Sequence, residues 1–160
     1  MTVIQSGGDA FRDAFETYLD MVYRIALQNT RSSTDAEDLA QEVFLRLYRC
    51  GQSFRDTEHM KAWLIRVTLN LCKNYWRDHR REPVELHPVQ EETTDLTLLD
   101  AVRELPPNQR NAIYLHYYEG YTAAEVGRML GAGTNTALSW LRRGREALRE
   151  KIGGIDNGDL

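Results

Sequence analysis

One short pattern in the C-terminal half of this chain restricts its fold more than any other segment. Gly120 ends one helical pattern, and Thr122 opens a second, with Glu125 three residues later in the arrangement of a capping box. A glycine-rich turn at residues 131–133 follows, in which a positive φ is easily adopted. Thr134 is then placed to cap a third helix. The order of these elements predicts a helix-turn-helix.

The two helices of this motif separate apolar from polar positions. The shorter helix has an apolar face of Val126, Met129 and Leu130. The longer helix repeats apolar residues at spacings of four, three and four, which points them inward: Ala137, Leu141, Gly144 and Leu148. Four arginines fall outside that stripe: Arg142, Arg143, Arg145 and Arg149. Such a helix suits a DNA major groove, with arginines left for phosphates and guanines. A surface helix with solvated arginines is the less favoured alternative.

Basic and acidic residues are concentrated in different segments of the chain, and the formal net charge does not show this separation. The formal net charge of −4 argues against a nucleic-acid partner at first sight. Residues 66–81, however, carry five basic side chains and one acid, and residues 128–151 carry six basic side chains and two acids. Between them, residues 82–100 hold six acids and no Lys or Arg. Because the local field governs binding to nucleic acid, the two basic blocks still permit it.

Composition and periodicity indicate an all-α protein of two small helical domains. An apolar content of 42% is enough for real cores, and 160 residues contain only four prolines. We expect helices over residues 9–29, 35–49 and 59–80, the second capped by Thr34 or Asp35, with a polar loop over 51–58. The expected inward residues are Phe11, Phe15, Tyr18, Val22 and Ile25 in the first, Ala36, Leu39, Ala40, Val43 and Leu47 in the second, and Met60, Leu64, Val67 and Leu71 in the third.

The rest of the chain predicts a tether and a second helical unit. Residues 82–95 are acidic, contain two prolines and lack periodicity, so they read as a flexible linker. Helices over residues 96–105 and 108–118 follow, separated by Pro106 and Pro107, and lead into the helix-turn-helix. The tail after residue 153 is expected to fray.

Several classes of function find no support in the sequence. Cys50 and Cys72 show no CxxC pattern and favour reduced thiols in a cytosolic chain, with a redox pair as the minor alternative. The four histidines have no zinc spacing with these cysteines, and no phosphate loop or nucleophile elbow is present. The N-terminus shows no export signal, and no apolar run approaches membrane-spanning length. We therefore expect no metal, no cofactor, no catalysis and no membrane insertion.

The most unusual side chains gather in the loop and the helix after it. They are Phe54, Arg55, Trp63, Asn70, Lys73, Asn74, Tyr75, Trp76, Arg77 and Arg80. Aromatic rings stack on bases, amides bond base edges and cations follow phosphates, so this cluster can hold single-stranded or melted DNA. Trp63, Asn70 and Arg77 recur every seven residues and share one helical face. In the alternative interpretation of this cluster, Trp63 and Tyr75 are core residues and the arginines are solvated. For Trp63 taken alone, the core interpretation is favoured.

A second cluster lies at the start of the preceding helix. Asp38 and Glu42 are one turn apart, but no third ligand sits at helical spacing. A protein-docking surface is therefore favoured over a metal or acid-base site.

Taken together, these residues resemble the extracytoplasmic-function group of bacterial RNA polymerase sigma factors, over residues 11–152. The segment that resembles the family's polymerase-docking helix is DAEDLAQEVFLRLYR, and the promoter-melting segment is SFRDTEHMKAWLIRVTLNLCKNYWRDHRR. The part of the chain that resembles the family's region 4 is LDAVRELPPNQRNAIYLHYYEGYTAAEVGRML together with the basic helix after it. The implied domains are region 2 over 1–81, an acidic linker over 82–95, region 4 over 96–152 and a tail over 153–160.

The resemblance implies a cytoplasmic protein, not an enzyme, that binds core RNA polymerase, recognises promoter DNA and helps to melt it. The positions matching the docking motif are Asp38, Gln41, Glu42 and Phe44. Those matching the −10 pocket and its nearby backbone contacts are Phe54, Arg55, His59, Asn70, Lys73, Arg77, Arg80 and Arg81, to which the cluster above adds Trp63. Those matching the −35 contacts are Thr136, Leu138, Ser139, Arg142 and Arg143. The acidic linker would pass through the polymerase near its RNA path, and a separate anti-sigma factor would supply regulation.

Four positions depart from the family pattern. Leu138 and Trp140 stand where basic residues are common, Asn74 replaces a common acid and Leu69 a common arginine. Leu138 could instead touch a thymine methyl. Two other functions stay open at this point: a free-standing helix-turn-helix regulator, and a sigma-like interaction module that does not read DNA.

Overall fold

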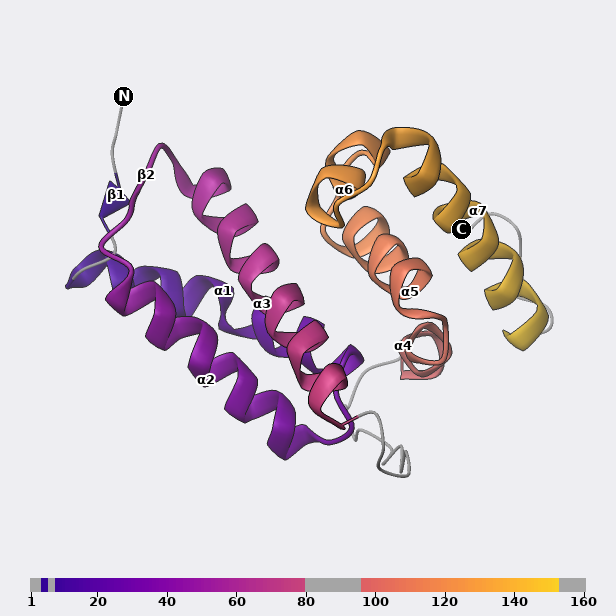
Figure 1. Ribbon diagram of the computed structural model, residues 1–160, viewed down its shortest axis with the longest axis horizontal. Helices are drawn as coiled ribbons and strands as arrows, with labels where there is room; N and C mark the ends of the chain where they lie inside the picture. Colours follow the sequence, from indigo (N-terminus) through magenta and orange to yellow (C-terminus); the bar gives the residue numbers. More distant parts are fainter. Residues whose placement is uncertain (1–3, 6–7, 80–95, 153–160) are drawn as a thin grey trace. The chain divides into compact units, whose positions relative to one another are not determined.

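The structure is a computed structural model that describes residues 4–5, 8–79 and 96–152 (Figure 1). Helices account for most of these residues, which confirms the all-α expectation. They divide into two compact units, Met1–His87 and Pro88–Leu160. The expected linker over 82–95 and the tail over 153–160 lie outside the described residues. None of the described helices is both long and apolar enough to cross a membrane.

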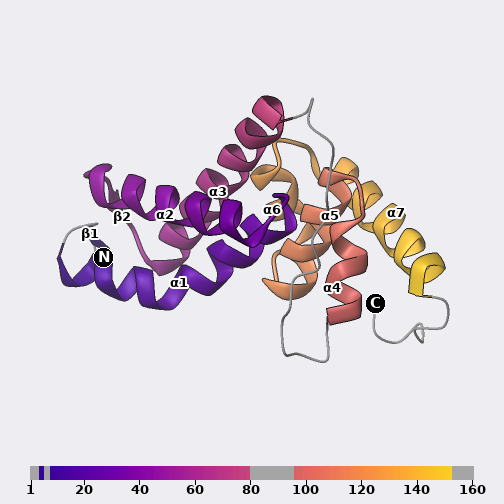
Figure 2. The ribbon, with the colours of Figure 1, turned by 90° about the horizontal axis from the view of Figure 1, so that it is seen from below.

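Unit 1 is a bundle of α1 (Asp9–Gln28), α2 (Ser33–Arg49) and α3 (Thr57–His79), which pack against one another (Figures 1 and 2). The expected core face of α2 is confirmed, because all five of its residues are buried. Val22 and Ile25 of α1, and Leu64 and Ile65 of α3, complete this core and are each at most 1% exposed. A two-residue ladder joins β1 (Ile4–Gln5) to β2 (Ser53–Phe54), with Ile4 opposite Phe54.

The expected inward stripe of α1 is wrong in its first half. Phe15 is 38% exposed, and Phe11 and Tyr18 are only half-buried. The ring of Phe15 packs edge-on against Phe44 of α2, with centroids 5.1 Å apart, so it lies at the edge of the α1–α2 interface rather than in the core. Periodicity identifies the helix face, but the extent of the covering neighbour decides burial along that face.

The expected stripe of α3 is too narrow. Met60 and Leu64 are buried as expected, whereas Val67 and Leu71 are half-buried. Because α3 packs against both α1 and α2, a wider face is covered, and it adds Ile65, Thr68, Leu69 and Cys72 to the buried set. Thr68 is tolerated there because its hydroxyl donates a hydrogen bond to the Leu64 carbonyl at 2.6 Å.

The cap of α2 also differs from the expectation. Ser32, not Thr34 or Asp35, is the N-cap, and its side chain accepts a hydrogen bond from the Asp35 N–H at 3.1 Å. At the end of α1, Thr30 donates to the Ala26 carbonyl at 2.8 Å. The chain therefore turns within four residues, 29–32, and α2 begins at Ser33.

Unit 2 is built around α7 (Thr134–Ile152), which contacts α4 (Leu96–Arg103), α5 (Pro107–Ile113) and α6 (Ala123–Met129). The four expected inward residues of α7 are all buried, which confirms that stripe. The helix expected over 108–118 instead passes from α5 into a π-helical turn, η1 (Tyr114–Tyr118). This wider turn buries Tyr114 and stacks it on Tyr118 at 5.3 Å between centroids.

The helix-turn-helix is present as predicted, except that Thr134 is the first residue of α7 rather than its cap. Thr122 caps α6, accepting from the Glu125 N–H at 3.2 Å, and its hydroxyl donates to the Glu125 carboxylate at 2.9 Å. Gly131 has a φ of 74°, a conformation that favours glycine. A Cβ on Gly127 would lie 2.7 Å from the Ala132 carbonyl, so α6 and the turn approach each other backbone to backbone.

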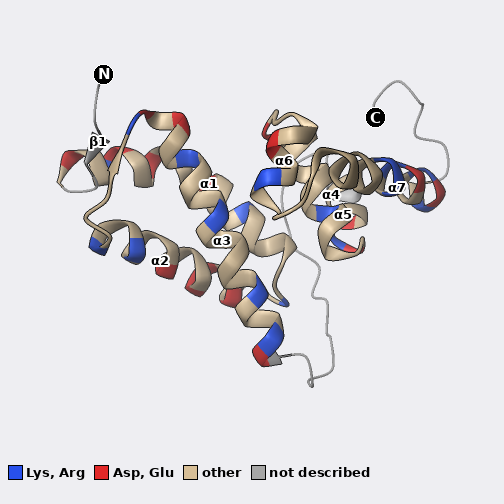
Figure 3. Ribbon diagram, turned by 45° about the horizontal axis from the view of Figure 1, so that its top comes forward, with Lys and Arg blue, Asp and Glu red and all other residues tan. Residues whose placement is uncertain are grey.

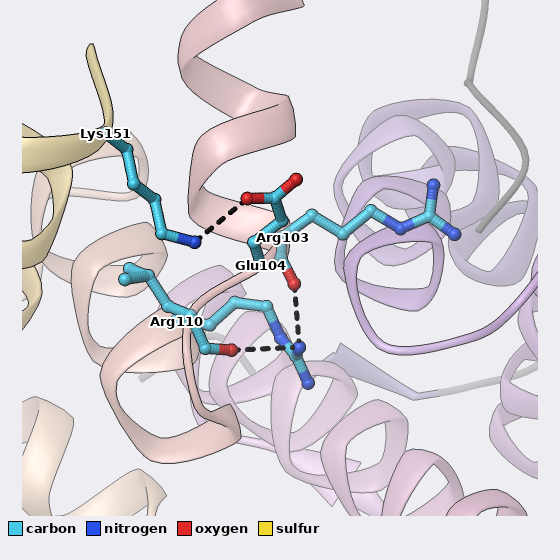
Figure 4. A network of polar contacts seen from close by, with 5 residues as sticks. Arg103, Glu104, Arg110 and Lys151 are labelled. Carbon is cyan, nitrogen blue, oxygen red and sulfur yellow. Dashed lines mark hydrogen bonds and ion pairs between the residues drawn. The ribbon is translucent and has the colours of Figure 1, made fainter. Parts of the chain in front are cut away.

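A buried arginine closes the end of α4 (Figure 4). Arg110 is only 7% exposed, and its Nη1 donates to the carbonyls of Arg103 and Leu105 at 3.0 and 3.3 Å. These carbonyls lie just before Pro106 and Pro107, where the helix stops and its last acceptors need donors. Lys151 of α7 adds a surface ion pair with Glu104 at 2.9 Å, a contact that typically contributes at most about 1 kcal/mol.

Gly144→Ala tests the contact between α5 and α7. An added Cβ would lie 2.7 Å from Cγ1 of Ile113, which is buried and cannot move away freely. We expect a loss of about 1–3 kcal/mol in the free energy of unfolding, measured by urea denaturation. Gly133→Ala is the matched control, because its Cβ would meet nothing within 4 Å. Equal stability of the two variants would contradict the tight packing of α7 on α5.

Candidate functional site

A single stripe of side chains runs along the solvent side of α3. Its members recur at spacings of four and three: His59, Trp63, Arg66, Asn70, Lys73 and Arg77, hereafter the α3 stripe. The last four are exposed and the first two are half-buried. Basic residues follow one another along α3 in Figure 3. The stripe contains the three residues predicted to share a face and adds Arg66, which belongs to the basic block but was not among the predicted site residues.

Phe54 lies behind the start of the α3 stripe rather than on the surface. Its side chain is 0% exposed, and its ring meets those of His59 and Trp63 edge-on, with centroids 5.4 and 5.7 Å away. Phe54 therefore presents no exposed ring face, and its place in the −10 pocket stays a prediction. The ring instead supports the two residues that begin the stripe.

The loop before α3 is held by its own hydrogen bonds. The Arg55 N–H donates to Nδ1 of His59 at 3.1 Å, and the His59 N–H donates to Asp56 Oδ1 at 2.8 Å. Arg55 keeps its side chain exposed. Since the backbone N–H occupies Nδ1, only Nε2 of His59 remains to bond a ligand.

Near the other end of α3, two aromatic residues tie the helix to the turn between α1 and α2. The Tyr75 hydroxyl donates to Asp35 Oδ2 at 2.6 Å and accepts from the Arg31 N–H at 3.2 Å. Trp76 Nε1 donates to the Asn29 carbonyl at 2.6 Å. Burial, and then the hydrogen bond to Asp35, raise the pKa of Tyr75 to about 12. Both rings are half-buried in structural contacts, which favours the structural interpretation over base stacking.

The predicted docking residues lie on α2, whose acidic and basic residues separate along the helix (Figure 3). Asp38 and Gln41 are exposed, and Glu42 is half-buried and accepts from Arg46 Nε at 3.1 Å. Phe44 is only 3% exposed, so it supports this face from the core instead of presenting itself. Asp38, Gln41 and Glu42 thus form an acidic and amide surface, hereafter the α2 face.

Two exposed apolar residues on α2 were missed by the sequence reasoning. Leu45 and Tyr48 are 44% and 61% exposed. They follow Gln41 at spacings of four and three and so continue the α2 face toward the end of the helix. The spacing was the available signal, since both residues fall outside the buried stripe.

The predicted residues on α7 are brought to the surface. Thr136, Leu138, Arg142 and Arg143 are exposed and Ser139 is half-buried. Trp140 is half-buried, and Arg145 donates to the Tyr117 hydroxyl at 3.2 Å. Arg80 and Arg81 lie outside the described residues.

The two units therefore offer different chemistry to nucleic acid. The α3 stripe combines an amide, a ring and several cations, which suits unpaired nucleotides. The α7 surface belongs to a helix-turn-helix, whose second helix suits the major groove of a duplex.

Comparisons with known proteins agree with this geometry. Two family models match: Sigma-70 region 2 over residues 14–82, and Sigma-70, region 4 over residues 95–148. The ECF RNA polymerase sigma factor SigM of Mycobacterium tuberculosis is 30% identical over 157 residues, covering 93% of this chain and 80% of the relative. SigW of Bacillus subtilis, also named an ECF sigma factor, is 27% identical and covers 90% of this chain and 89% of its own.

A solved structure shares the fold. The sigma factor RpoE from Bartonella quintana, crystallised with the anti-sigma factor NepR, superposes with a TM-score of 0.77 at 22% identity. The match covers 93% of this chain and 100% of that one.

The Tyr75–Asp35 contact predicts a particular alkaline stability profile. Because the pKa of Tyr75 stands above its ordinary 10.0, the folded state holds this proton more tightly than the unfolded state. Its stabilising contribution is full below pH 10 and is lost as the pH rises toward about 12. We expect the free energy of unfolding to fall more steeply over this interval in the natural chain than in Tyr75→Phe. Tyr48→Phe, at a 61% exposed position, serves as control and should track the natural chain; identical profiles for all three would refute the assignment.

Proposed function

The chain belongs to the sigma-70 family, in its extracytoplasmic-function group, and from this we propose how its surfaces divide the work of promoter recognition. As a sigma factor it binds core RNA polymerase and directs it to promoter DNA to begin transcription. A free-standing regulator is not favoured, since region 2 and region 4 both match. The observation that carries the division of roles is the pairing, in one chain, of an α3 stripe suited to unpaired bases with an α7 surface suited to duplex DNA.

The α2 face is the proposed contact with core polymerase. Asp38 and Gln41 present their polar ends to solvent, and Glu42 is oriented by Arg46. Phe44 contributes from beneath by packing on Phe15, which fixes the helix surface above it. An acidic face of this kind fits a basic partner surface, and complementary charge speeds association.

The α3 stripe is the proposed site that captures the melted −10 element. Asn70 lies at its centre, where an amide can bond a base edge, and Lys73 and Arg77 can follow the phosphates. Extruding a base costs a few kcal/mol, which stacking and edge hydrogen bonds offset. Trp63, backed by Phe54 and half-buried, is the indole ring of this stripe and is proposed to stack on a base. Arg66 joins the phosphate contacts in this scheme, as do Arg55, Arg80 and Arg81.

The α7 surface is the proposed −35 contact. Thr136, Leu138 and Ser139 lie in the first turns, which enter the groove in this class of motif. Arg142 and Arg143 follow, where they can reach phosphates or a guanine. The boundaries 1–81, 82–95, 96–152 and 153–160 are proposed as region 2, linker, region 4 and tail.

Regulation by a protein partner follows from the same assignment. The related RpoE was crystallised with an anti-sigma factor, and we propose that such a partner covers the polymerase-binding surface of this chain. The proposed place of work is the cytoplasm, where bacterial polymerase and promoters meet. The chain acts by binding, and we propose that it is not itself an enzyme.

Co-purification with bacterial core polymerase, followed by run-off transcription on fragmented host DNA, tests the proposal directly. Transcripts from discrete sites, absent with core alone, are expected. Core binding without transcripts would favour an interaction module, and no core binding would favour a free-standing regulator.

Two substitutions should separate opening from docking. Asn70→Ala removes the central amide of the α3 stripe, and we expect roughly tenfold less promoter opening in a permanganate footprint with core binding unchanged. Asp38→Ala should show the opposite pattern. It should weaken core binding, measured by gel filtration, without a direct effect on promoter opening. Thr17→Ala, exposed on α1, is the control for both. Normal opening by Asn70→Ala would remove Asn70 from the −10 site.

Arg143→Ala tests the duplex contact of α7. Loss of one phosphate contact should lower the slope of log affinity against log salt by roughly one, whereas loss of a base contact should relax preference at one position. Arg12→Ala, an exposed arginine on α1, matches the change in net charge. If Arg143→Ala and Arg12→Ala bind alike in slope and in preference, Arg143 does not touch DNA.

A further inference from the structure

The start of α7 carries no charge. No Lys, Arg, Asp or Glu occurs between Arg128 and Arg142, so the first two turns of α7, residues 134–141, are neutral. We call this segment the reading tip. Four of its side chains are exposed, and they are Thr134, Asn135, Thr136 and Leu138. The first turns of the second helix meet base edges in a helix-turn-helix, so the tip is the part that reads sequence.

Burial on the other side of the helix fixes which tip residues point outward. Ala137 and Leu141 are at most 1% exposed and hold α7 against the rest of unit 2. Asn135 and Leu138 are three residues apart outside the buried stripe, and Arg142 follows four residues later. All three are exposed and lie on one face, which a groove would meet together.

A neutral tip limits the bases that it can recognise. The commonest specific contact to guanine uses Arg or Lys, and the tip has neither. Asparagine bonds both N6 and N7 of adenine, and an apolar side chain packs on the C5-methyl of thymine. Leu138, half-exposed at 50%, is the one large apolar side chain on this face.

We propose that the reading tip selects A·T pairs in the −35 element, with Leu138 on a thymine methyl and Asn135 on the adenine of a neighbouring pair. This inference rests on the proposed function of α7. The spacing agrees, because residues three apart are about 4.5 Å apart along a helix and successive base pairs are about 3.4 Å apart. Arg142 then reaches the flanking backbone or a base beyond the A·T pairs.

A solitary exposed leucine is common on protein surfaces and by itself indicates nothing. What distinguishes Leu138 is its place between an exposed asparagine and an exposed arginine, on the face and in the turns that enter the groove. Leu45 of α2 is exposed to a similar degree, at 44%, but lies outside that setting.

Uracil, which lacks only the C5-methyl, provides the direct test. The probe is duplex promoter DNA, taken from sites that the holoenzyme transcribes, in which each −35 thymine is replaced in turn by deoxyuridine. Affinity of the holoenzyme is measured with the natural chain, Leu138→Ala and the control Thr17→Ala, which changes an exposed position on α1. One replacement should weaken the natural chain about three- to fivefold, the scale of one buried methyl group.

The Leu138→Ala holoenzyme should bind the thymine probe with a similar loss and no longer distinguish thymine from uracil at that position. The Thr17→Ala holoenzyme should keep the full distinction between thymine and uracil. Asn135→Ala should relax preference for adenine at the adjacent pair and leave the uracil effect in place. No uracil effect at any position, or the same effect in Leu138→Ala, would overturn the inference.

The outcome separates this inference from the function on which it rests. If no discrete start sites are transcribed, the proposed function fails before the probes can be chosen. If transcription is promoter-specific but thymine and uracil bind alike, the function stands and the reading by Leu138 is wrong.

Discussion

Burial of one face on each helix decides which side chains remain for partners. In α7, Ala137, Leu141, Gly144 and Leu148 are held against the rest of unit 2, and the helix cannot rotate without exposing them. Gly144 makes this constraint strict, since even a Cβ would collide with Ile113. The outward residues of the helix are therefore fixed by packing on its far side. The same reasoning holds for α2, whose five-residue buried stripe turns Asp38 and Gln41 to solvent.

Polar side chains complete each unit where helices end. In unit 1, Tyr75 and Trp76 bond the turn between α1 and α2, so the exposed Lys73 and Arg77 stand on an anchored helix. In unit 2, Arg110 supplies donors to the carbonyls after α4, next to prolines that have no N–H to give. Each contact satisfies buried polar groups and also fixes a segment that holds candidate site residues. Neither contact is part of the proposed DNA-binding surfaces, and both hold the helices that carry those surfaces.

Local patterns in the sequence predicted much of this, and the failures have physical causes. The stripes of α2 and α7 and the Thr122 cap follow from periods and spacings within one segment. Ser32 was missed because several possible caps stand in a row, and only the geometry after α1 selects among them. Phe54 is the one aromatic residue of a loop expected to be polar, and pairing of its strand with β1 and packing on Trp63 enclose its ring. The burial of Arg110 and the π-helical turn were likewise not predicted, because both depend on packing between elements that hydrophobic periodicity within one segment does not show.

The separation of the buried and exposed faces of α7 affects how a sigma factor of this kind can diverge in evolution. Substitutions at half-exposed positions away from the core usually change stability by less than about 0.5 kcal/mol, whereas those in the buried stripe cost far more. Position 138 therefore lies where the fold tolerates change while the surface offered to DNA is altered. A duplicated copy of this chain could acquire a different set of target genes through one or two replacements, without first needing a compensating change in its core. The architecture thus permits parallel regulators that share one polymerase and one scaffold.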